Sequence, residues 1–276
     1  MGKKSIVLGI ACIVLVFAMQ ATAWAVAWKV DVESYSGYVT YKESEDLSGT
    51  QLDSNWSAYL NRTGLALKEY DHESWEGEMR VGFSFTSEDS ETWDVGGARY
   101  QTNDMKYWAL DSGFLLGWAV PLDMGSSSEP NMYLTPLIGY NYKFMRFTRT
   151  NFNILNTITI TDTVDEDFYI HALELGGKFD FMVNEKLALF VKPIWGIVLY
   201  DYAHNSIGGG IEGKEGSYYI NLDTGVEYSI DENWVVGLLF RAEWQRLKGG
   251  NRDNEVFWPD NSLDAYGGEV NVAYRF

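Results

Sequence analysis

Apolar and polar residues alternate with a period of two over long stretches of this chain. The segment WEGEMRVGFSF, residues 75–85, places Trp, Gly, Met, Val and two Phe residues at odd positions, with Glu, Arg, Gly and Ser between them. The segment YYINLDTGVEYSI, residues 218–230, repeats the pattern. Because side chains two residues apart lie on the same face of a β-strand, each segment predicts a strand with one apolar and one mostly polar face.

Counting such segments predicts ten strands, at residues 28–42, 54–69, 75–87, 105–120, 132–148, 167–183, 187–204, 217–230, 234–247 and 262–276. The gaps between them are alternately short and long. Short turns are expected at 70–74, 184–186 and 231–233, with a longer one at 121–131; long polar loops are expected at 43–53, 88–104, 149–166, 205–216 and 248–261. This arrangement is typical of transmembrane β-barrels. We therefore expect an all-β fold, a ten-stranded antiparallel transmembrane β-barrel with short periplasmic turns, long extracellular loops and both termini periplasmic.

The composition of the two faces distinguishes a barrel in lipid from a soluble sandwich. The polar face combines small residues with charges of both signs, which can pair across a narrow lumen. The apolar face carries aromatic residues toward the strand ends, as in the interfacial girdles of membrane proteins. These aromatic residues include Trp75, Tyr142, Phe144, Tyr169, Phe181, Trp195, Tyr218, Tyr228, Trp234, Trp244, Tyr266, Tyr274 and Phe276.

The N-terminus predicts export. Lys3 and Lys4 precede the apolar run SIVLGIACIVLVFAM, and the small residues of QATAWAVA follow it. The run is shorter than the about 20 residues that a spanning helix needs. We expect residues 1–25 to be a cleaved secretory signal peptide and residues 26–276 to form the barrel in the outer membrane; the alternative is an N-terminal membrane anchor. Cys12, the single cysteine, lies in this run, so the mature chain has no disulfide.

The chain is strongly acidic, with a formal net charge of −18. Nucleic acid is a poor partner for such a surface. Cationic peptides or divalent cations fit it better, although acidic loops also serve solubility alone. No cofactor or metal site is indicated. Outer-membrane lipid and lipopolysaccharide are the partners expected from the barrel itself.

The chain resembles known outer-membrane barrels in its last residues, VNVAYRF. These barrels end in a strand with a terminal Phe that the barrel-assembly machinery reads, so Phe276 is the expected signal. Ten strands with five outer loops resemble the omptin surface proteases more specifically. The similarity is greatest in GWAVPL, in LIGYNYKFMRFTRTNF (137–152) and in LELGGKFDFMVNEKLALFVKPIWGIVLYDYAH.

The omptin resemblance implies peptide cleavage between basic residues, by an Asp-x-Asp pair and an Asp-x-His pair that activate a water. The nearest equivalents here are Asp89-x-Glu91 in the second long loop and Asp201 with His204 near the fourth. Both depart from the pattern. A spacing of three places Asp201 and His204 on opposite faces of a strand unless a bulge intervenes. Solvated loop carboxylates and a polar strand end are the simpler interpretation of these candidate catalytic residues.

Two further classes of function remain. A lipid A deacylase would use His204 with Ser206, oriented by Glu212 or Glu215, but these residues run into a glycine-rich loop. A non-catalytic narrow porin or surface-binding barrel fits ten strands, which enclose little more than their own side chains. Residues 153–168, with alternating Thr and Ile, and the Phe257-Trp258-Pro259 patch are candidate contact surfaces. We expect the non-catalytic barrel, with the omptin-like peptidase as the alternative; whether the chain is an enzyme stays open.

Overall fold

The structure is a computed structural model that describes residues 28–47, 49–69, 75–122, 131–155, 157–207, 209–212, 215–252, 256–257 and 259–276. The expected signal peptide, its Cys12 and Trp258 of the candidate patch lie outside these residues. No helix in the described part of the chain is long and apolar enough to cross a membrane.

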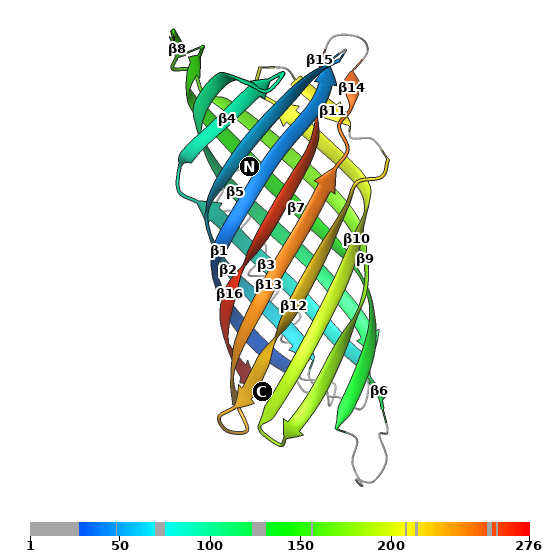
Figure 1. Cartoon of the computed structure of the whole chain (residues 1–276). Helices are drawn as coiled ribbons and strands as arrows, with labels where there is room; N and C mark the ends of the chain where they lie inside the picture. Colours follow the sequence, from blue (N-terminus) through cyan, green and yellow to red (C-terminus); the bar gives the residue numbers. More distant parts are fainter. Residues whose placement is uncertain are drawn as a thin grey trace, which may run out of the picture.

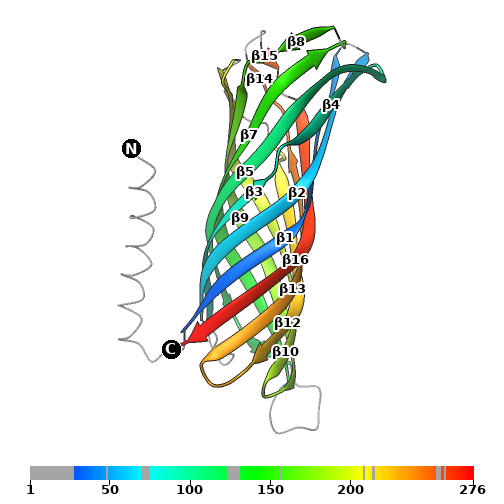
Figure 2. The same ribbon diagram turned by 90° about the vertical axis from the view of Figure 1, so that its left-hand side faces the viewer.

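The described residues form a closed barrel of ten antiparallel strands, which confirms the fold class (Figures 1 and 2). β3 and β4 follow one another in one barrel strand, because both pair with β2 and with β5. The ten strands are β1 (Trp28–Leu47), β2 (Thr50–Glu69), β3 (Trp75–Thr86) with β4 (Asp89–Val95), β5 (Ala98–Trp118), β7 (Met132–Ile154), β9 (Val164–Asn184), β10 (Leu187–Asn205), β12 (Tyr218–Ser229), β13 (Trp234–Leu247) and β16 (Asp260–Arg275).

Three short strands extend the wall, and two more form a separate hairpin. β6 (Val120–Pro121) and β8 (Ile158–Ile160) pair with β7, and β11 (Gly209–Glu212) pairs with β10. β14 (Asn251–Arg252) and β15 (Val256–Phe257) pair with each other. The end that carries β8, β11, β14 and β15 is called the loop end, and the opposite end, which carries β6 and the C-terminus, is called the turn end (Figure 1). Trp28 lies at the turn end too, because its carbonyl accepts from the Phe276 backbone N–H.

β1 and β16 close the barrel. They pair in one unbroken register from Lys29–Arg275 to Ser44–Asp260. Gly37 and Gly267 face each other in this ladder, and a Cβ added at Gly37 would lie 2.3 Å from the carbonyl oxygen of Tyr266. Glycine is therefore required here by the close approach of the two backbones.

Three of the predicted loops consist largely of paired strands, which corrects the sequence interpretation. β1 and β2 pair up to Leu47 and Thr50, so residues 43–53 form a hairpin tip. Residues 88–104 are β4 and β5, which turn at Gly96 and Gly97 with φ of 56° and 80°. Here the ladder extends beyond the apolar band, so these strand residues are mostly polar on both faces and lack the regular alternation used to recognise strands. Residues 149–166 are also largely paired: β7 continues to Ile154, β8 covers Ile158–Ile160 and β9 begins at Val164.

The outward face is apolar where a membrane would surround it. Large hydrophobic side chains are exposed there on every barrel strand from Val32 to Phe276. Aromatic pairs lie toward both ends of this band. Trp75 and Trp118 are 5.2 Å apart at the turn end, and Tyr38 and Tyr59 are 5.6 Å apart toward the loop end. Lipid, and not water, is the solvent that suits this face, so the barrel is of the transmembrane type.

Candidate functional site

The lumen is filled by three successive layers of side chains. The charged layer occupies the turn-end half, an apolar layer follows it, and a cluster around Arg149 lies at the loop end. Alternation along β1 places one member of each layer on the same face: Asp31 in the charged layer, Tyr41 in the apolar layer and Glu43 beside Arg149. Any activity of the lumen depends on how these layers are packed.

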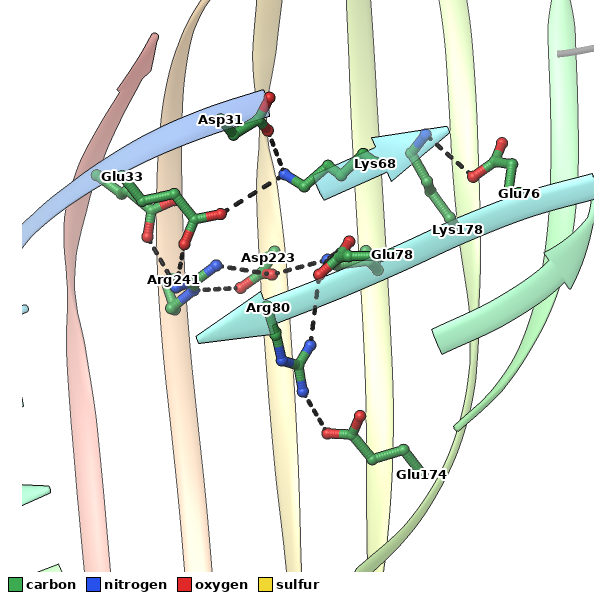
Figure 3. A network of polar contacts seen from close by, with 12 residues as sticks. Asp31, Glu33, Lys68, Glu76, Glu78, Arg80, Glu174, Lys178, Asp223 and Arg241 are labelled. Atoms are coloured by element: carbon green, nitrogen blue, oxygen red, sulfur yellow. Dashed lines mark hydrogen bonds and ion pairs between the residues drawn. The ribbon is translucent and has the colours of Figure 1, made fainter. Parts of the chain in front are cut away.

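β3 provides the charges that bridge the lumen (Figure 3). The Arg80 guanidinium lies 2.5 Å from a carboxylate oxygen of Glu174 on β9. Glu78 accepts from the Lys192 ammonium of β10 at 3.1 Å, and Glu76 lies 3.4 Å from Lys178 of β9. Figure 1 shows β3 and β9–β10 as separate parts of the wall, so these ion pairs cross the interior. They connect β3 with β9 and β10, from which β5 and β7 separate it along the wall.

The rest of the charged layer is also ion-paired. Arg241 lies 2.8 Å from both Asp223 and Glu269. Lys68 lies 2.5 Å from Asp31, and the Lys29 ammonium lies 2.9 Å from Glu227. Removing one member of such a pair leaves a buried charge without its partner, which is costly. The charged layer therefore comprises paired charges with an excess of carboxylates: Lys29, Asp31, Glu33, Lys68, Glu76, Glu78, Arg80, Glu174, Lys178, Asp180, Lys192, Asp223, Glu227, Arg241 and Glu269.

A cavity of about 480 Å³ lies at the turn end of the charged layer. Seven basic and seven acidic residues line it, together with apolar residues that include Leu115, Leu137, Phe190 and Leu239. Residues of the turns, such as Glu185 and Lys186, also belong to its lining, so the cavity reaches the turn-end mouth. It is a chamber whose lining combines charges of both signs with several apolar side chains.

The apolar layer closes the lumen above this chamber. Phe147 is fully buried at its centre, with ring centroids of Tyr41, Tyr107 and Phe168 at 4.3, 5.1 and 5.8 Å. None of the layer's buried members is more than 8% exposed in the described chain. The members are Tyr35, Val39, Tyr41, Trp56, Ala58, Leu60, Met105, Tyr107, Ala109, Met145, Phe147, Phe168, Ile170, Ala203, Leu247, Leu263 and Ala265. Ions and polar solutes have no wide path through such a layer.

Arg149 binds three carboxylates at the loop end of the apolar layer. It forms a bidentate contact with Glu91, in which Nε donates to Oε2 at 2.5 Å and Nη2 donates to Oε1 at 2.9 Å. Nη2 also donates to Glu43 at 3.1 Å, and Nη1 donates to Glu166. Arg149 is 3% exposed and Glu91 is fully buried. One guanidinium thus faces three buried carboxylates, which leaves an excess of negative charge in this cluster.

The excess charge appears in the titration of Glu43, which lies on the loop-end extension of β1. Burial, with the nearby carboxylates of Glu166 and Glu91, raises the pKa of Glu43 to about 7, although Arg149 opposes this shift. The Tyr41 hydroxyl donates to Glu43 at 2.5 Å. Burial also acts to raise the pKa of Glu91, but the Arg149 guanidinium lowers that pKa further, and the net direction is down. Burial therefore brings the pKa of Glu43 near neutral pH, in contrast to the lowered pKa of Glu91.

The residues predicted as catalytic are placed separately. Asp89 is exposed and accepts from the Ser90 backbone N–H at 2.8 Å, whereas Glu91 is held by Arg149. Asp201 lies in the lumen, where the Ser217 hydroxyl donates to it at 3.1 Å. The bulge of β10 between Val198 and Tyr200 precedes Asp201, so it does not alter the spacing to His204.

His204 does not share the lumen with these carboxylates. Its neighbour Ala203 is buried in the apolar layer, so alternation along β10 turns the His204 ring outward, where it is exposed. Asp201 lies two residues before Ala203, so its side chain is on the same, inward face of β10. The structure therefore does not bring His204 together with Asp201 and Glu91 in a single cleft.

The residues of the deacylase hypothesis are also accounted for. The Ser206 hydroxyl accepts from the Asp165 backbone N–H at 3.1 Å, and the Ser206 N–H donates to the Asp165 carbonyl at 2.9 Å. Glu212 pairs with Tyr202 in the β10–β11 ladder, and Glu215 lies in the turn that follows. These contacts tie Ser206 to the end of β9.

Sequence reasoning did not find Arg149, Glu43, Glu166 or the apolar layer. Near Arg149 the chain reads FMRF, with Phe144 outward and Met145 inward, so apolar residues occupy both faces and hide the alternation. The sequence signal for the apolar layer is a second apolar face, which several strands carry at the same level of the barrel. Within the described residues, no group of His, Cys, Asp and Glu side chains is placed to hold a metal ion.

Comparisons with known proteins find similar barrels among solved structures. The translocator domain of the autotransporter NalP from Neisseria meningitidis is 12% identical, with 97% of this chain and 98% of that chain covered and a TM-score of 0.41. The transport unit of the autotransporter AIDA-I from Escherichia coli is 10% identical, with 92% and 91% covered and a TM-score of 0.38. A major outer membrane protein from Thermus thermophilus is 12% identical, with 90% and 99% covered and a TM-score of 0.38. No family model and no curated protein sequence matches the chain.

Proposed function

We propose that this chain is an outer-membrane barrel with a sealed lumen, whose function is to bind partners at the cell surface. The observation that carries the proposal is the apolar layer, which fills the lumen with side chains no more than 8% exposed. An open porin requires a continuous polar path, and the closed layer opposes one. The sealed barrel is thus favoured over the narrow porin.

The membrane placement follows from the outward face and the export signal. We place the turn end in the periplasm, with residues 1–25 removed during export. The terminal Phe276 is 51% exposed on the outward face, and its backbone N–H donates to the Trp28 carbonyl at 3.1 Å. An exposed aromatic end on the closing strand is accessible to the barrel-assembly machinery. Outer-membrane lipid and lipopolysaccharide would surround the apolar band.

The binding surface we propose is the loop-end extension of the strands. Paired strands hold this region above the apolar band, and binding residues often lie where a rigid scaffold positions them. Its exposed residues include Glu88, Asp89 and Asp162, in a chain of net charge −18. Basic peptides or proteins are the partners that this charge would attract.

Conductance measurements test the sealed lumen. We expect the purified wild-type barrel to give no steady current in planar lipid bilayers, because the apolar layer excludes water and ions. An open porin of similar preparation is the control for insertion. Steady single-channel currents from the wild-type chain would contradict the sealed barrel and support the narrow porin.

The omptin-like peptidase is the alternative function, and its test is cleavage of dibasic peptides with lipopolysaccharide present. We expect no cleavage, because the His204 ring points outward while Glu91 and Asp201 face the lumen. His204→Ala is the matched variant. Cleavage by the wild type that this variant loses would establish the peptidase and overturn our expectation.

A further inference from the structure

β8 (Ile158–Ile160) is an edge strand at the far loop end of the barrel (Figures 1 and 2). Within the described residues it pairs with residues 152–154 of β7 and with no other strand. It continues the line of β9 along β7, and the next strand on that side is β10. β10 ends before it reaches β8, where the Ser206 N–H donates to the Asp165 carbonyl of β9 at 2.9 Å.

The free side of β8 presents the backbone groups of Thr159. The Ile154 carbonyl accepts from the Thr157 N–H at 3.0 Å, so the backbone groups of Ile154 point toward β8. In an antiparallel ladder, successive residues direct their N–H and carbonyl groups to opposite sides. Thr159, which is opposite Asn153, therefore directs both groups away from β7. A further strand could pair with them.

The hairpin of β7 and β8 has an apolar face toward the barrel axis. Gln101 pairs with Ile154, and its side chain donates to the buried Asn103 at 3.1 Å, so the Gln101 and Ile154 side chains lie on the inner face. Side chains that are opposite one another in a ladder share a face. The apolar face of the hairpin consists of Phe152, Ile154, Ile158 and Ile160.

This apolar face lies beyond the lipid. The outward side chains of β7 are polar from Arg146 onward, so the apolar band ends near Phe144. From Phe144 to Ile154 the strand runs about 30 Å at about 3.3 Å per residue, which is about 20 Å along the membrane normal at a tilt of about 45°. Ile158 is 55% exposed and Ile160 is 38% exposed. An apolar patch that faces water at this height indicates a contact surface.

β8 lacks the features that protect most edge strands. The segment TITITDT, residues 157–163, has no proline and no lysine, and the ladder with β7 has no bulge. Threonine and isoleucine also favour extended backbone. Leu155, at the tip of the hairpin, has φ of 50° and is 59% exposed. A strained apolar tip beside an unprotected edge favours a role in binding.

The charges around this edge favour a basic partner. Asp162 follows β8 and is exposed, and Asp104 is half-exposed on the outward face of β5. Arg146, the cation below them on β7, already donates to Asp167 at 2.5 Å. Two copies joined through β8 would bring these carboxylates together in a chain of net charge −18, so repulsion opposes a dimer at this edge.

We propose that the free edge of β8 binds an extended basic segment of a partner protein by β-strand addition. The Thr159 N–H donates to a carbonyl of the segment, and the Thr159 carbonyl accepts from one of its N–H groups. Apolar residues of the segment lie beside Ile158 and Ile160, and the basic residues between them share the outward face of Thr159. This inference rests on the proposed surface-binding function and names the site and the form of the partner.

A short peptide of alternating lysine and valine tests the site. Its fluorescence anisotropy with the whole detergent-solubilised barrel should show saturable binding. A peptide of the same composition with its valines adjacent, and a copy N-methylated along one edge, should bind at least about tenfold more weakly, because they lose the matching face or the edge hydrogen bonds. All three peptides carry the same charge, so general attraction to an acidic barrel cannot separate them.

Thr159→Pro tests the edge from the side of the barrel. Proline removes the N–H that points away from β7, and the β7–β8 ladder does not use that group. We expect the alternating peptide to bind about tenfold more weakly to this variant. Thr159→Ala keeps the N–H and is the matched control, with affinity within about twofold of the wild type. Heat-modifiable migration on gels verifies that both variants are folded.

Three results would overturn the edge site: no peptide binding by the wild type, equal affinity for the three peptides, or equal affinity of Thr159→Pro and the wild type. Peptide binding that ignores the edge would leave surface binding elsewhere on the loop end in place, whereas steady conductance would contradict the proposed function itself. A wild-type dimer in sedimentation that Thr159→Pro makes monomeric would assign the edge to a second copy and overturn the peptide partner.

Discussion

Arg149→Ala is expected to destabilise the folded barrel by about 3–5 kcal/mol, the usual consequence of removing one partner from a buried ion pair. Arg149 is the cation that contacts Glu43, Glu91 and Glu166 in this cluster, and its removal leaves three buried carboxylates facing one another. The measurement is the urea midpoint for unfolding of the detergent-solubilised barrel, followed by heat-modifiable migration. An unchanged midpoint would show that water already solvates these carboxylates.

The loss of stability in Arg149→Ala is expected to grow as the pH rises. Without Arg149 the carboxylates must take up protons to remain buried, so their folded pKa values rise above those of the unfolded chain. Stability then falls as pH rises through that interval. The deficit of Arg149→Ala should therefore be smaller at pH 5 than at pH 8. A deficit that is equal at both pH values would contradict the electrostatic explanation.

Glu43→Gln, in contrast to Arg149→Ala, is expected to keep or increase the stability of the barrel. The folded pKa of Glu43 is raised from 4.5 to about 7, so ionisation of this buried carboxyl lowers wild-type stability as pH rises through that window. The substituted amide has no charge, and its oxygen still accepts from the Tyr41 hydroxyl. We expect Glu43→Gln to equal or exceed the wild type in stability at pH 8, with a flatter pH dependence between 4.5 and 7.

Phe147→Ala should have the second large effect, a loss of about 3–5 kcal/mol from the cavity left in the lumen. Phe147 is fully buried and contacts the rings of Tyr41, Tyr107 and Phe168. The matched control is Phe85→Ala, because Phe85 is 42% exposed on the outward face and leaves no internal cavity. The same urea midpoints report both variants, and we expect the control to lose less than half as much.

The apolar layer also predicts a gain of conductance. The double variant Phe147→Ala, Phe168→Ala removes two of its rings and should admit water, so that currents appear in planar bilayers where the wild type gives none. If the double variant folds and stays silent, the charged layer or the Arg149 cluster also blocks ions.

The barrel could be predicted from the sequence because one face of its strands meets lipid. Alternation is strong wherever that condition holds, as at Trp75–Thr86, where the predicted strand matches β3 within one residue. It fails at Asp89–Val95 and at the ends of β1 and β2, where both faces are mostly polar although the backbone is still paired. The change from apolar to polar residues marks the edge of the lipid-facing band, whereas the paired strands continue beyond that edge.

The candidate site was less predictable because it depends on contacts across the lumen. Glu91 was identified as an acidic residue, but its partner Arg149 is 58 residues away in the sequence. The omptin-like spacing drew attention to His204, whose outward orientation depends on strand parity near a bulge.

The pairing of β1 with β16 has a consequence for how the molecule is made. Lys29 and Arg275 are partners in the closing ladder, so nearly the entire chain separates the two sides of this contact. Contacts between such distant residues form slowly, because a large loop must close before they contribute stability. Until β16 has been synthesised and delivered, β1 presents an unpaired edge of about 20 residues. The intermediate should therefore depend on chaperones during export, and a chain truncated before Asp260 should aggregate rather than insert.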